Sequence, residues 1–184
     1  IQKDRLDAYP NQLSGGMKQR VMIAMAMILN PDLVIMDEPT TALDVVVQRN
    51  IIEKIEDLRK EFNFSIIFIT HDLSLLVEIS DKLAIMYAGK ILEIGPAGQI
   101  YSNPLHPYTK GLMNSFPPLT GEIEKMSGIE GKPPDLLNPP PGCPFYPRCE
   151  KRMDICQKKM PEFKEIEVEQ RVRCYLYQGG NSVE

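Results

Sequence analysis

Residues 32–39, DLVIMDEP, place four apolar residues directly before two carboxylates. A short and continuous apolar run of this kind is typical of a strand that is buried on both faces of a parallel sheet. In an open parallel sheet, ligands bind beyond the carboxyl ends of the strands. The stretch therefore predicts an α/β fold in which Asp37 and Glu38 lie at the ligand-binding edge.

The neighbouring segments alternate between helical and strand-like patterns. Apolar residues at helical spacing, ended by Pro31 in the first case, predict the helices. The expected elements are helices at 15–30 and 45–62, a second buried strand at 64–72, a helix at 73–80, and a hairpin at 82–95 that turns at Ala88-Gly89. This order predicts an α/β layer with a mostly parallel sheet over residues 1–95.

The composition changes after residue 95, because 13 of the 16 prolines follow it. Residues 96–142 are predicted to form a connector rich in proline and glycine, largely irregular over 117–142. Residues 143–178 contain all four cysteines and are predicted to form a small unit, followed by a flexible tail at 179–184.

Bulk properties exclude two classes of protein. The formal net charge of -4 argues against a nucleic-acid binder that works through a broad basic face. The longest apolar run, VMIAMAMIL at residues 21–29, is too short to span a bilayer. The chain begins without a methionine and runs straight into its first motif, so we expect it to be a fragment.

His71 follows the second predicted strand, as Asp37 and Glu38 follow the first. Two acids and an imidazole at one sheet edge suit phosphoryl transfer, because one acid can hold Mg²⁺ while the other polarises the attacking water. The imidazole can then hydrogen-bond the transferred phosphate. The alternative is that Asp37 caps a turn and that His71 is a histidine satisfied within the core.

A second candidate site lies at Ser14-Gly15-Gly16, where the first helix begins. Two glycines expose backbone N–H groups and let an oxyanion approach closely, and the helix dipole favours negative charge there. The pattern indicates phosphate binding. The alternative is a simple serine N-cap followed by tolerated glycines.

Three motifs resemble those of the ATP-binding-cassette (ABC) ATPases, in order and at the expected spacing. LSGGMKQR at residues 13–20 resembles the signature motif, although Met17 stands where glutamine is most frequent. LVIMDE resembles the Walker B strand, TALD the D-loop and ITHD the H-loop. The resemblance implies a P-loop-NTPase-like sheet, ATP and Mg²⁺ as cofactors, and a second ATPase subunit as partner.

The resemblance also implies a role for each candidate residue. Asp37 would associate with Mg²⁺, Glu38 would polarise the attacking water, and His71 would contact the γ-phosphate. The signature residues would bind the γ-phosphate of ATP held by the opposite subunit, and Asp44 would communicate between the two sites. The implied set is catalytic Glu38 and His71 with cofactor-binding Ser14, Gly15, Gly16, Asp37 and Asp44.

One part of the expected motif set is missing from these residues. A phosphate loop of the form G-x-x-x-x-G-K-[ST] should precede the other motifs. Neither Gly-Lys pair, at 89–90 or at 131–132, has a glycine five positions before it. We therefore expect the chain alone to bind ATP poorly and to hydrolyse it barely at all.

The later sequence resembles the C-terminal extension of oligopeptide and dipeptide importer ATPases. NPLHPYTKGLMNSFP at 103–117 carries the likeness, and GCPFYPRC at 142–149 fits the same extension. This implies an energising subunit at the cytoplasmic face of the membrane, with permease subunits and an extracytoplasmic peptide-binding protein as partners and no nucleic acid. The alternatives are a soluble ABC-type ATPase and a non-enzymatic metal-binding or interaction module.

Four cysteines, Cys143, Cys149, Cys156 and Cys174, lie in a segment with too little apolar bulk to fold stably alone. Disulfides, a zinc ion and an iron–sulfur cluster are all compatible with a cross-linked unit, but disulfides do not suit a reducing cytosol. The surrounding lysines and arginines would offset thiolate charge. Some peptide-importer ATPases have a similar cysteine-bearing tail that holds a four-iron cluster, which favours a 4Fe–4S cluster here, with zinc as the second alternative and unliganded thiols as the third.

Overall fold

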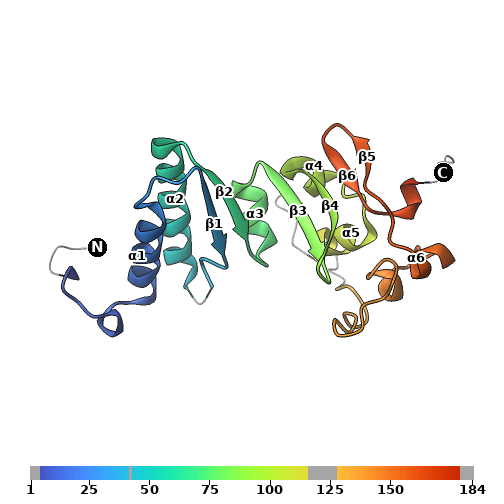
Figure 1. Cartoon of the computed structure of the whole chain (residues 1–184), viewed down its shortest axis with the longest axis horizontal. Helices are drawn as coiled ribbons and strands as arrows, with labels where there is room; N and C mark the ends of the chain where they lie inside the picture. The colour runs from blue at the N-terminus through green and yellow to red at the C-terminus, as the bar shows by residue number, and fades with distance from the viewer. Residues whose placement is uncertain (1–4, 42, 116–127, 179–184) are drawn as a thin grey trace. The chain divides into compact units, whose positions relative to one another are not determined.

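The computed structural model of the chain describes residues 5–41, 43–115 and 128–178 (Figure 1). The chain divides into two compact units, Ile1–Leu73 and Ser74–Glu184. Each unit is described by itself below.

The first unit alternates helices and strands as predicted. Its elements are α1 (Gly15–Met27), β1 (Leu33–Asp37), α2 (Val45–Phe62) and β2 (Ser65–Ile69), and α3 (Leu73–Ile79) begins at its last residue. β1 and β2 pair in parallel, with Leu33 opposite Ser65 and Asp37 opposite Ile69. The α/β class and the parallel pairing are therefore confirmed, and both strands end at the same edge.

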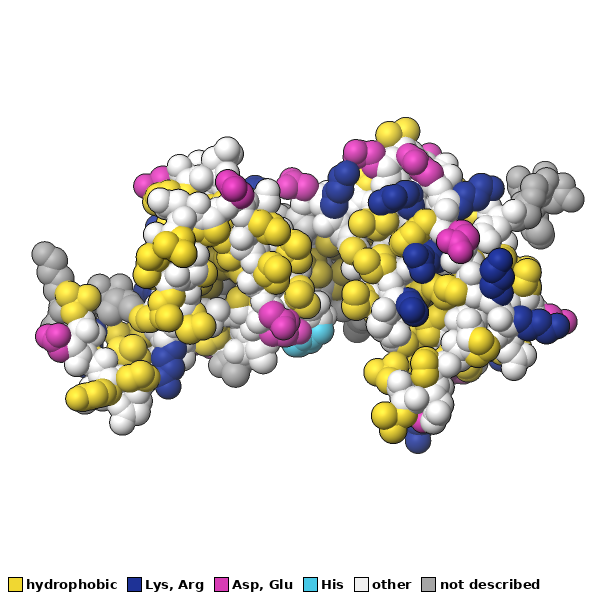
Figure 2. Space-filling view, viewed as in Figure 1, with side chains coloured by type: hydrophobic (Ala, Val, Ile, Leu, Met, Phe, Trp, Pro, Cys, Tyr) yellow, Lys and Arg dark blue, Asp and Glu magenta, His cyan; other side chains and the backbone are white. Residues whose placement is uncertain are grey.

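The β1–β2 sheet is covered on one face only. Val34 and Met36 are buried, whereas Leu33 and Ile35 on the other face are 48% and 62% exposed. The prediction that this strand is buried on both faces is wrong for the chain as described, because no described element covers the second face. Figure 2 shows apolar side chains on the surface of this unit.

α2 has the boundaries that the sequence predicts, and local interactions explain both ends. The Asp44 carboxylate accepts a hydrogen bond from Val47 N at 2.9 Å and so caps the first turn. Asn63 adopts the left-handed conformation (φ 52°) that commonly ends helices. The buried face of the helix carries Ile51, Ile52 and Ile55.

The second unit is built on a four-stranded antiparallel sheet in the order β3-β4-β6-β5. β3 (Lys82–Tyr87) and β4 (Lys90–Pro96) form the predicted hairpin, and Ala88 (φ 48°) and Gly89 (φ 74°) supply the left-handed turn that it requires. β5 (Lys164–Glu167) and β6 (Gln170–Val172) come from the cysteine-bearing segment. The sequence did not predict these two strands or the pairing of β6 with β4.

Short helices complete this unit: α4 (Ala97–Ser102), α5 (Pro107–Asn114), α6 (Asp154–Lys158), and 3-10 helices at Tyr146–Arg148 and Tyr175–Tyr177. Residues 128–142 contain neither helix nor strand, as expected for the connector. The rest of the predicted irregular segment, up to residue 127, and the tail at 179–184 lie outside the described residues. Within the described ranges, no helix is both long and apolar enough to cross a membrane.

A buried carboxylate joins the connector to the sheet. Glu93 on β4 is 0% exposed. Its two oxygens accept hydrogen bonds from Leu105 N and His106 N, both at 2.9 Å, and from Gln170 Nε2 at 2.8 Å. Because a buried carboxylate must be fully hydrogen-bonded, these contacts hold the start of α5 and the strand β6 against β4.

Candidate functional site

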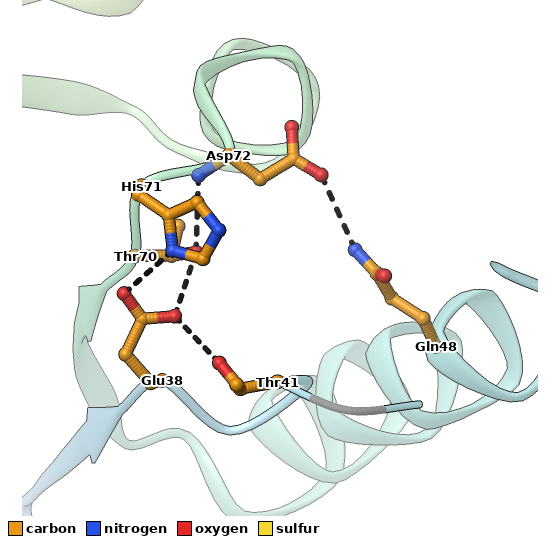
Figure 3. Close-up of polar contacts among 6 residues, drawn as sticks. All are labelled: Glu38, Thr41, Gln48, Thr70, His71 and Asp72. Atoms are coloured by element: carbon orange, nitrogen blue, oxygen red, sulfur yellow. Dashed lines mark hydrogen bonds and ion pairs between the residues drawn. The ribbon is translucent and has the colours of Figure 1, made fainter. Parts of the chain in front are cut away.

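Glu38 and His71 meet at the carboxyl ends of β1 and β2 (Figure 3). Glu38 Oε1 lies 2.9 Å from His71 Nδ1. Glu38 itself has a φ of 47°, which is uncommon for a residue other than glycine and occurs preferentially at functional sites. The structure thus brings together the two residues that the sequence predicts to be catalytic.

Two threonines fix the other oxygen of the Glu38 carboxylate. Thr41 Oγ1 donates to Glu38 Oε2 at 2.8 Å, and Thr70 Oγ1 donates to the same oxygen at 3.5 Å. Thr70 Oγ1 in turn accepts from Asp72 N at 3.2 Å. Figure 3 shows that these groups converge on Glu38 from the loops that follow the two strands. The carboxylate is therefore held in one orientation before any ligand binds.

The contact between the two residues shifts the pKa of each. The hydrogen bond from His71 lowers the pKa of Glu38, with a further contribution from Thr41, and the same contact with Glu38 raises the pKa of His71. An ionised carboxylate only accepts hydrogen bonds, so Nδ1 of His71 carries the shared proton. The raised pKa favours the protonated ring, in which the Nε2–H of the 81% exposed His71 side chain can donate to a phosphate oxygen.

A lowered pKa makes Glu38 a weaker base. The carboxylate is thus better suited to orienting and polarising a water molecule than to removing its proton completely.

The remaining predicted residues lie on other elements. Asp37 ends β1 with an exposed side chain, next to Glu38. Ser14 is the N-cap of α1, and its Oγ accepts from Met17 N at 3.4 Å. Asp44 is the N-cap of α2. Within the described ranges, neither Ser14 nor Asp44 makes a hydrogen bond or an ion pair with Glu38 or His71.

Gly15 and Gly16 form the first turn of α1, as predicted, but the structure gives one of them a packing role. A Cβ atom added at Gly16 would lie 2.7 Å from Val47 Cγ1, which is closer than real atoms approach. At Gly15 the nearest atom would be Leu43 Cδ2 at 3.2 Å. Gly16 therefore also permits the close approach of α1 and α2.

The four cysteines of the second unit gather around one cavity, and all four are free thiols. We refer to them as the cysteine cluster: Cys143, Cys149, Cys156 and Cys174. A backbone hydrogen bond of 2.7 Å from Cys143 N to Cys156 O joins two of the segments. Gly142 makes this approach possible, because an added Cβ would collide with the Cys156 carbonyl oxygen.

Burial makes Cys143, Cys149 and Cys174 hard to ionise. It raises the pKa of Cys143 to about 11 and that of Cys174 to about 12, and it also raises the pKa of Cys149. The cavity measures about 10 Å³, room for roughly one water-sized atom. In the described part of the chain, no three His, Cys, Asp or Glu side chains are close enough to hold a metal ion as they stand.

His106 lines the same cavity and is only 2% exposed. It is the N-cap of α5, and its Nδ1 accepts from Tyr108 N at 3.0 Å. Burial lowers the pKa of His106 to about 4, so the ring is neutral at physiological pH. On composition alone, residues 106–108 would be only a helix start with a buried tyrosine. The structure shows instead that the histidine is the more deeply buried residue.

Sequence reasoning assigned no role to Thr41, Thr70, Glu93 or His106. The two threonines lie within the quoted motifs, so their position beside Glu38 and His71 was an available signal. Glu93 and His106 offered no comparable signal, because their burial depends on contacts with segments 12 to 77 residues away in sequence.

Comparisons with known families agree with this arrangement. The family described as "ABC transporter" matches residues 1–41. The family described as "Oligopeptide/dipeptide transporter, C-terminal region" matches residues 92–156. The first match includes the start of α1 and the strand β1 that precedes Glu38. The second match includes Glu93, His106 and three members of the cysteine cluster.

Individual relatives match most of the chain. The "Dipeptide transport ATP-binding protein DppD" of Caldanaerobacter subterraneus subsp. tengcongensis is 49% identical over 175 residues, which cover 95% of this chain and 54% of the relative. The "Oligopeptide transport ATP-binding protein OppD" of Escherichia coli is 51% identical over 159 residues, which cover 86% of this chain and 47% of the relative. The chain thus spans about half the length of the curated relatives it matches.

A solved dimeric structure of the ATP-binding cassette MJ0796, in a post-hydrolysis state with ADP and Pi, has a TM-score of 0.47 and 29% identity. The match covers 53% of this chain and 41% of the chain in the solved structure. The two family matches and the level of identity to the curated relatives together show that this chain is homologous to ABC transporter ATP-binding subunits, and that its residues 92–156 are similar to the oligopeptide/dipeptide C-terminal region.

Proposed function

We propose that this chain is part of an ATP-hydrolysing subunit that energises the import of oligopeptides or dipeptides through a membrane permease. The observation that carries the proposal is the 2.9 Å contact between Glu38 and His71 at the ends of two parallel strands. The names of the relatives, which are dipeptide and oligopeptide transport ATP-binding proteins, support peptides as the transported class. The partners proposed on this basis are a second ATPase subunit, permease subunits and an extracytoplasmic peptide-binding protein, at the cytoplasmic face of the membrane.

The roles proposed for the site residues rest on the family resemblance together with their positions. Asp37 binds the Mg²⁺ of Mg-ATP, Glu38 orients and polarises the attacking water, and His71 uses Nε2 to hydrogen-bond the γ-phosphate. Thr41 and Thr70 hold the Glu38 carboxylate in place. When bound, Mg²⁺ neutralises charge that develops on the phosphates.

The residues at the helix starts act across a subunit interface in this proposal. Ser14, Gly15 and Gly16 present a hydroxyl and backbone N–H groups to the γ-phosphate held by the partner. Asp44 lies at the start of α2, next to the first turn of α1, where Val47 approaches Gly16. A change at Asp44 can therefore reach the phosphate-binding start of α1 through the packing of α1 against α2.

The proposal is tested by joining the chain to an upstream segment that carries a phosphate loop and measuring phosphate release. Glu38→Gln should lower the rate by about 10²–10⁴-fold, the usual contribution of a positioned acid–base group, while ATP binding is retained. The matched control is Glu61→Gln, because Glu61 is an exposed glutamate of α2. An unchanged rate in the Glu38 variant, or an equal loss in the control, would contradict the assigned role.

The isolated chain provides a second test. It contains no G-x-x-x-x-G-K-[ST] sequence, and that loop supplies most of the grip on the β- and γ-phosphates. We therefore propose that the chain by itself is inactive. Measurable ATP turnover by the purified 184-residue chain would contradict this proposal and would point to another phosphate-binding element.

We also propose a metal centre at the cysteine cluster, in the form of a 4Fe–4S cluster with a zinc ion as the alternative. The convergence of four free thiols, spread over residues 143–174, on one cavity supports it. Four thiolates are a donor set that suits both groups. Figure 2 shows lysine and arginine side chains gathered over this unit, and these would offset the charge of the thiolates. The thiols are not close enough to hold a metal ion as they stand, so either form of the centre requires them to move.

Elemental analysis of anaerobically purified chain distinguishes these forms. About four irons and visible absorption support the cluster, and one colourless zinc supports the alternative. Cys174→Ser should lower the bound metal sharply in either case, since it removes one of four ligands. Metal-free protein with four titratable thiols would refute the metal centre.

A further inference from the structure

One contact in Figure 3 joins α2 to the loop that carries His71, and the roles proposed above do not use it. Gln48 Nε2 donates to Asp72 Oδ2 at 3.4 Å. The two residues are 24 positions apart in sequence, and both are half-buried. A hydrogen bond to a carboxylate is charge-assisted and is therefore stronger than one between neutral groups. The contact thus holds a point on α2 against the residue that follows His71.

Gln48 is also tied to the start of its own helix. Its backbone N–H donates to the Asp44 carbonyl oxygen at 2.9 Å. The Asp44 carboxylate caps the same turn by accepting from Val47 N at 2.9 Å. A movement of Asp44 is therefore passed directly to Gln48, because the two residues share a hydrogen bond within one helical turn.

On its other side, Asp72 is connected to the carboxylate of Glu38. Asp72 N donates to Thr70 Oγ1 at 3.2 Å, and Thr70 Oγ1 donates to Glu38 Oε2 at 3.5 Å. A hydroxyl can accept one hydrogen bond while it donates another, so Thr70 links the two acidic residues. The hydrogen bonds form a continuous series that runs from Asp44 through Gln48, Asp72 and Thr70 to Glu38.

We propose that Gln48 is a positioning residue that makes the orientation of Glu38 depend on the start of α2, an inference that rests on the function proposed above. Gln48 acts through Asp72 and is not itself catalytic. Because Asp44 is proposed to act across the subunit interface, the series gives the partner subunit a connection to the carboxylate that polarises the water.

The lengths of two bonds in the series fit this role. The bond from Gln48 to Asp72 and the bond from Thr70 to Glu38 are both longer than usual for their types. Hydrogen bonds at catalytic sites are often long without ligands and tighten only when the reacting groups are in place. We therefore expect the series to tighten when ATP and the partner subunit bind.

The test exchanges the two groups of the Gln48–Asp72 contact. Gln48→Glu removes the donor and places a carboxylate opposite Asp72, and adding Asp72→Asn restores an amide opposite a carboxylate in the reverse order. Gln48→Leu removes the donor without adding charge, which keeps the test decisive if Gln48→Glu does not fold. The matched control is Asn50→Asp, which makes the same change from amide to carboxylate at an exposed position of α2.

Phosphate release is measured in the protein that carries the upstream phosphate loop. Gln48→Glu and Gln48→Leu should lower kcat about tenfold and leave KM for ATP nearly unchanged, because a misplaced catalytic group slows chemistry more than binding. The double variant should return kcat to within about threefold of the unsubstituted protein, since the two changes compensate only if the groups interact. Asn50→Asp should leave both constants unchanged.

A second measurement reports the contact itself without ATP. In NMR spectra of the 184-residue chain, Asp72→Asn should shift the side-chain amide signals of Gln48, because it changes the acceptor of that amide. Unchanged amide signals would show that the contact is absent in solution and would overturn the inference.

Two kinetic results would also overturn it. One is an equal kcat for Gln48→Glu, Gln48→Leu and Asn50→Asp, and the other is a double variant that stays as slow as Gln48→Glu. If Glu38→Gln hydrolyses ATP at the full rate, the proposed function fails and this inference fails with it. An inactive Glu38→Gln beside fully active Gln48 variants refutes the inference alone, so the two failures are distinguishable.

Discussion

Glu93→Gln tests whether a single buried carboxylate holds the second unit together. The side chain is 0% exposed and accepts three N–H groups at 2.8–2.9 Å, from two backbone amides and from Gln170. A glutamine keeps one oxygen, so at least one donor meets an NH₂ group and loses its acceptor.

The expected magnitude follows from these contacts. An unsatisfied buried N–H costs about 1–3 kcal/mol, and each bond that changes from charge-assisted to neutral loses about 1 kcal/mol. Removal of a buried charge lowers the desolvation cost and offsets part of this loss. We therefore expect Glu93→Gln to lower the free energy of unfolding by about 2–3 kcal/mol.

The assay is urea unfolding followed by tyrosine fluorescence. Six of the seven tyrosines lie in Ser74–Glu184 and the chain has no tryptophan, so the signal reports mainly on this unit. Glu167→Gln on β5 is the matched control, because Glu167 is exposed and should change stability by less than about 0.5 kcal/mol. A Glu93 variant as stable as this control would refute the reasoning.

Four further predictions concern the first unit. In NMR titrations, Glu38→Gln should return the pKa of His71 toward its ordinary value near 6.5, because the contact with Glu38 raises it; no change would mean that the two do not interact in solution. The same pairing should stabilise the fold fully between the ordinary pKa values of 4.5 and 6.5, and this stabilisation should be lost as the pH falls through the lowered pKa of Glu38 or rises through the raised pKa of His71. Gly16→Ala should destabilise the unit by about 1–2 kcal/mol in hydrogen-exchange measurements, and adding Val47→Ala to the same chain should relieve part of this loss. A double variant whose loss of stability equals the sum of the two single losses would contradict the close contact. Asp44→Ala should cost about 1 kcal/mol through loss of the α2 cap, detected as faster amide exchange in its first turn.

Much of the first unit could be predicted because its signals are local. The period of the apolar residues and the helix-terminating proline locate α1, α2 and the two strands within a few residues. The turn at Ala88-Gly89 is likewise a short-range signal, and the hairpin has the predicted pairing. The placement of Asp37, Glu38 and His71 at strand ends was predicted from the apolar runs that precede them.

The exposure of Leu33 and Ile35 and the strands of the cysteine-bearing segment could not be predicted in this way. An apolar run shows that a strand can be buried, but not whether the chain supplies a layer for each face. β5 and β6 are short and rich in charged residues, and β6 is stabilised by pairing with β4 across more than 70 residues of sequence.

The sequence by itself determined the class of fold, the order of the motifs and the identity of the chemical groups, because these depend on residue type and spacing. Only the tertiary structure decided that the threonines orient Glu38, that Gly16 serves helix packing, and that Glu93 and His106 are buried and joined by a hydrogen bond. The reason is physical: burial and hydrogen bonding between distant segments are collective, so no single stretch of sequence specifies them.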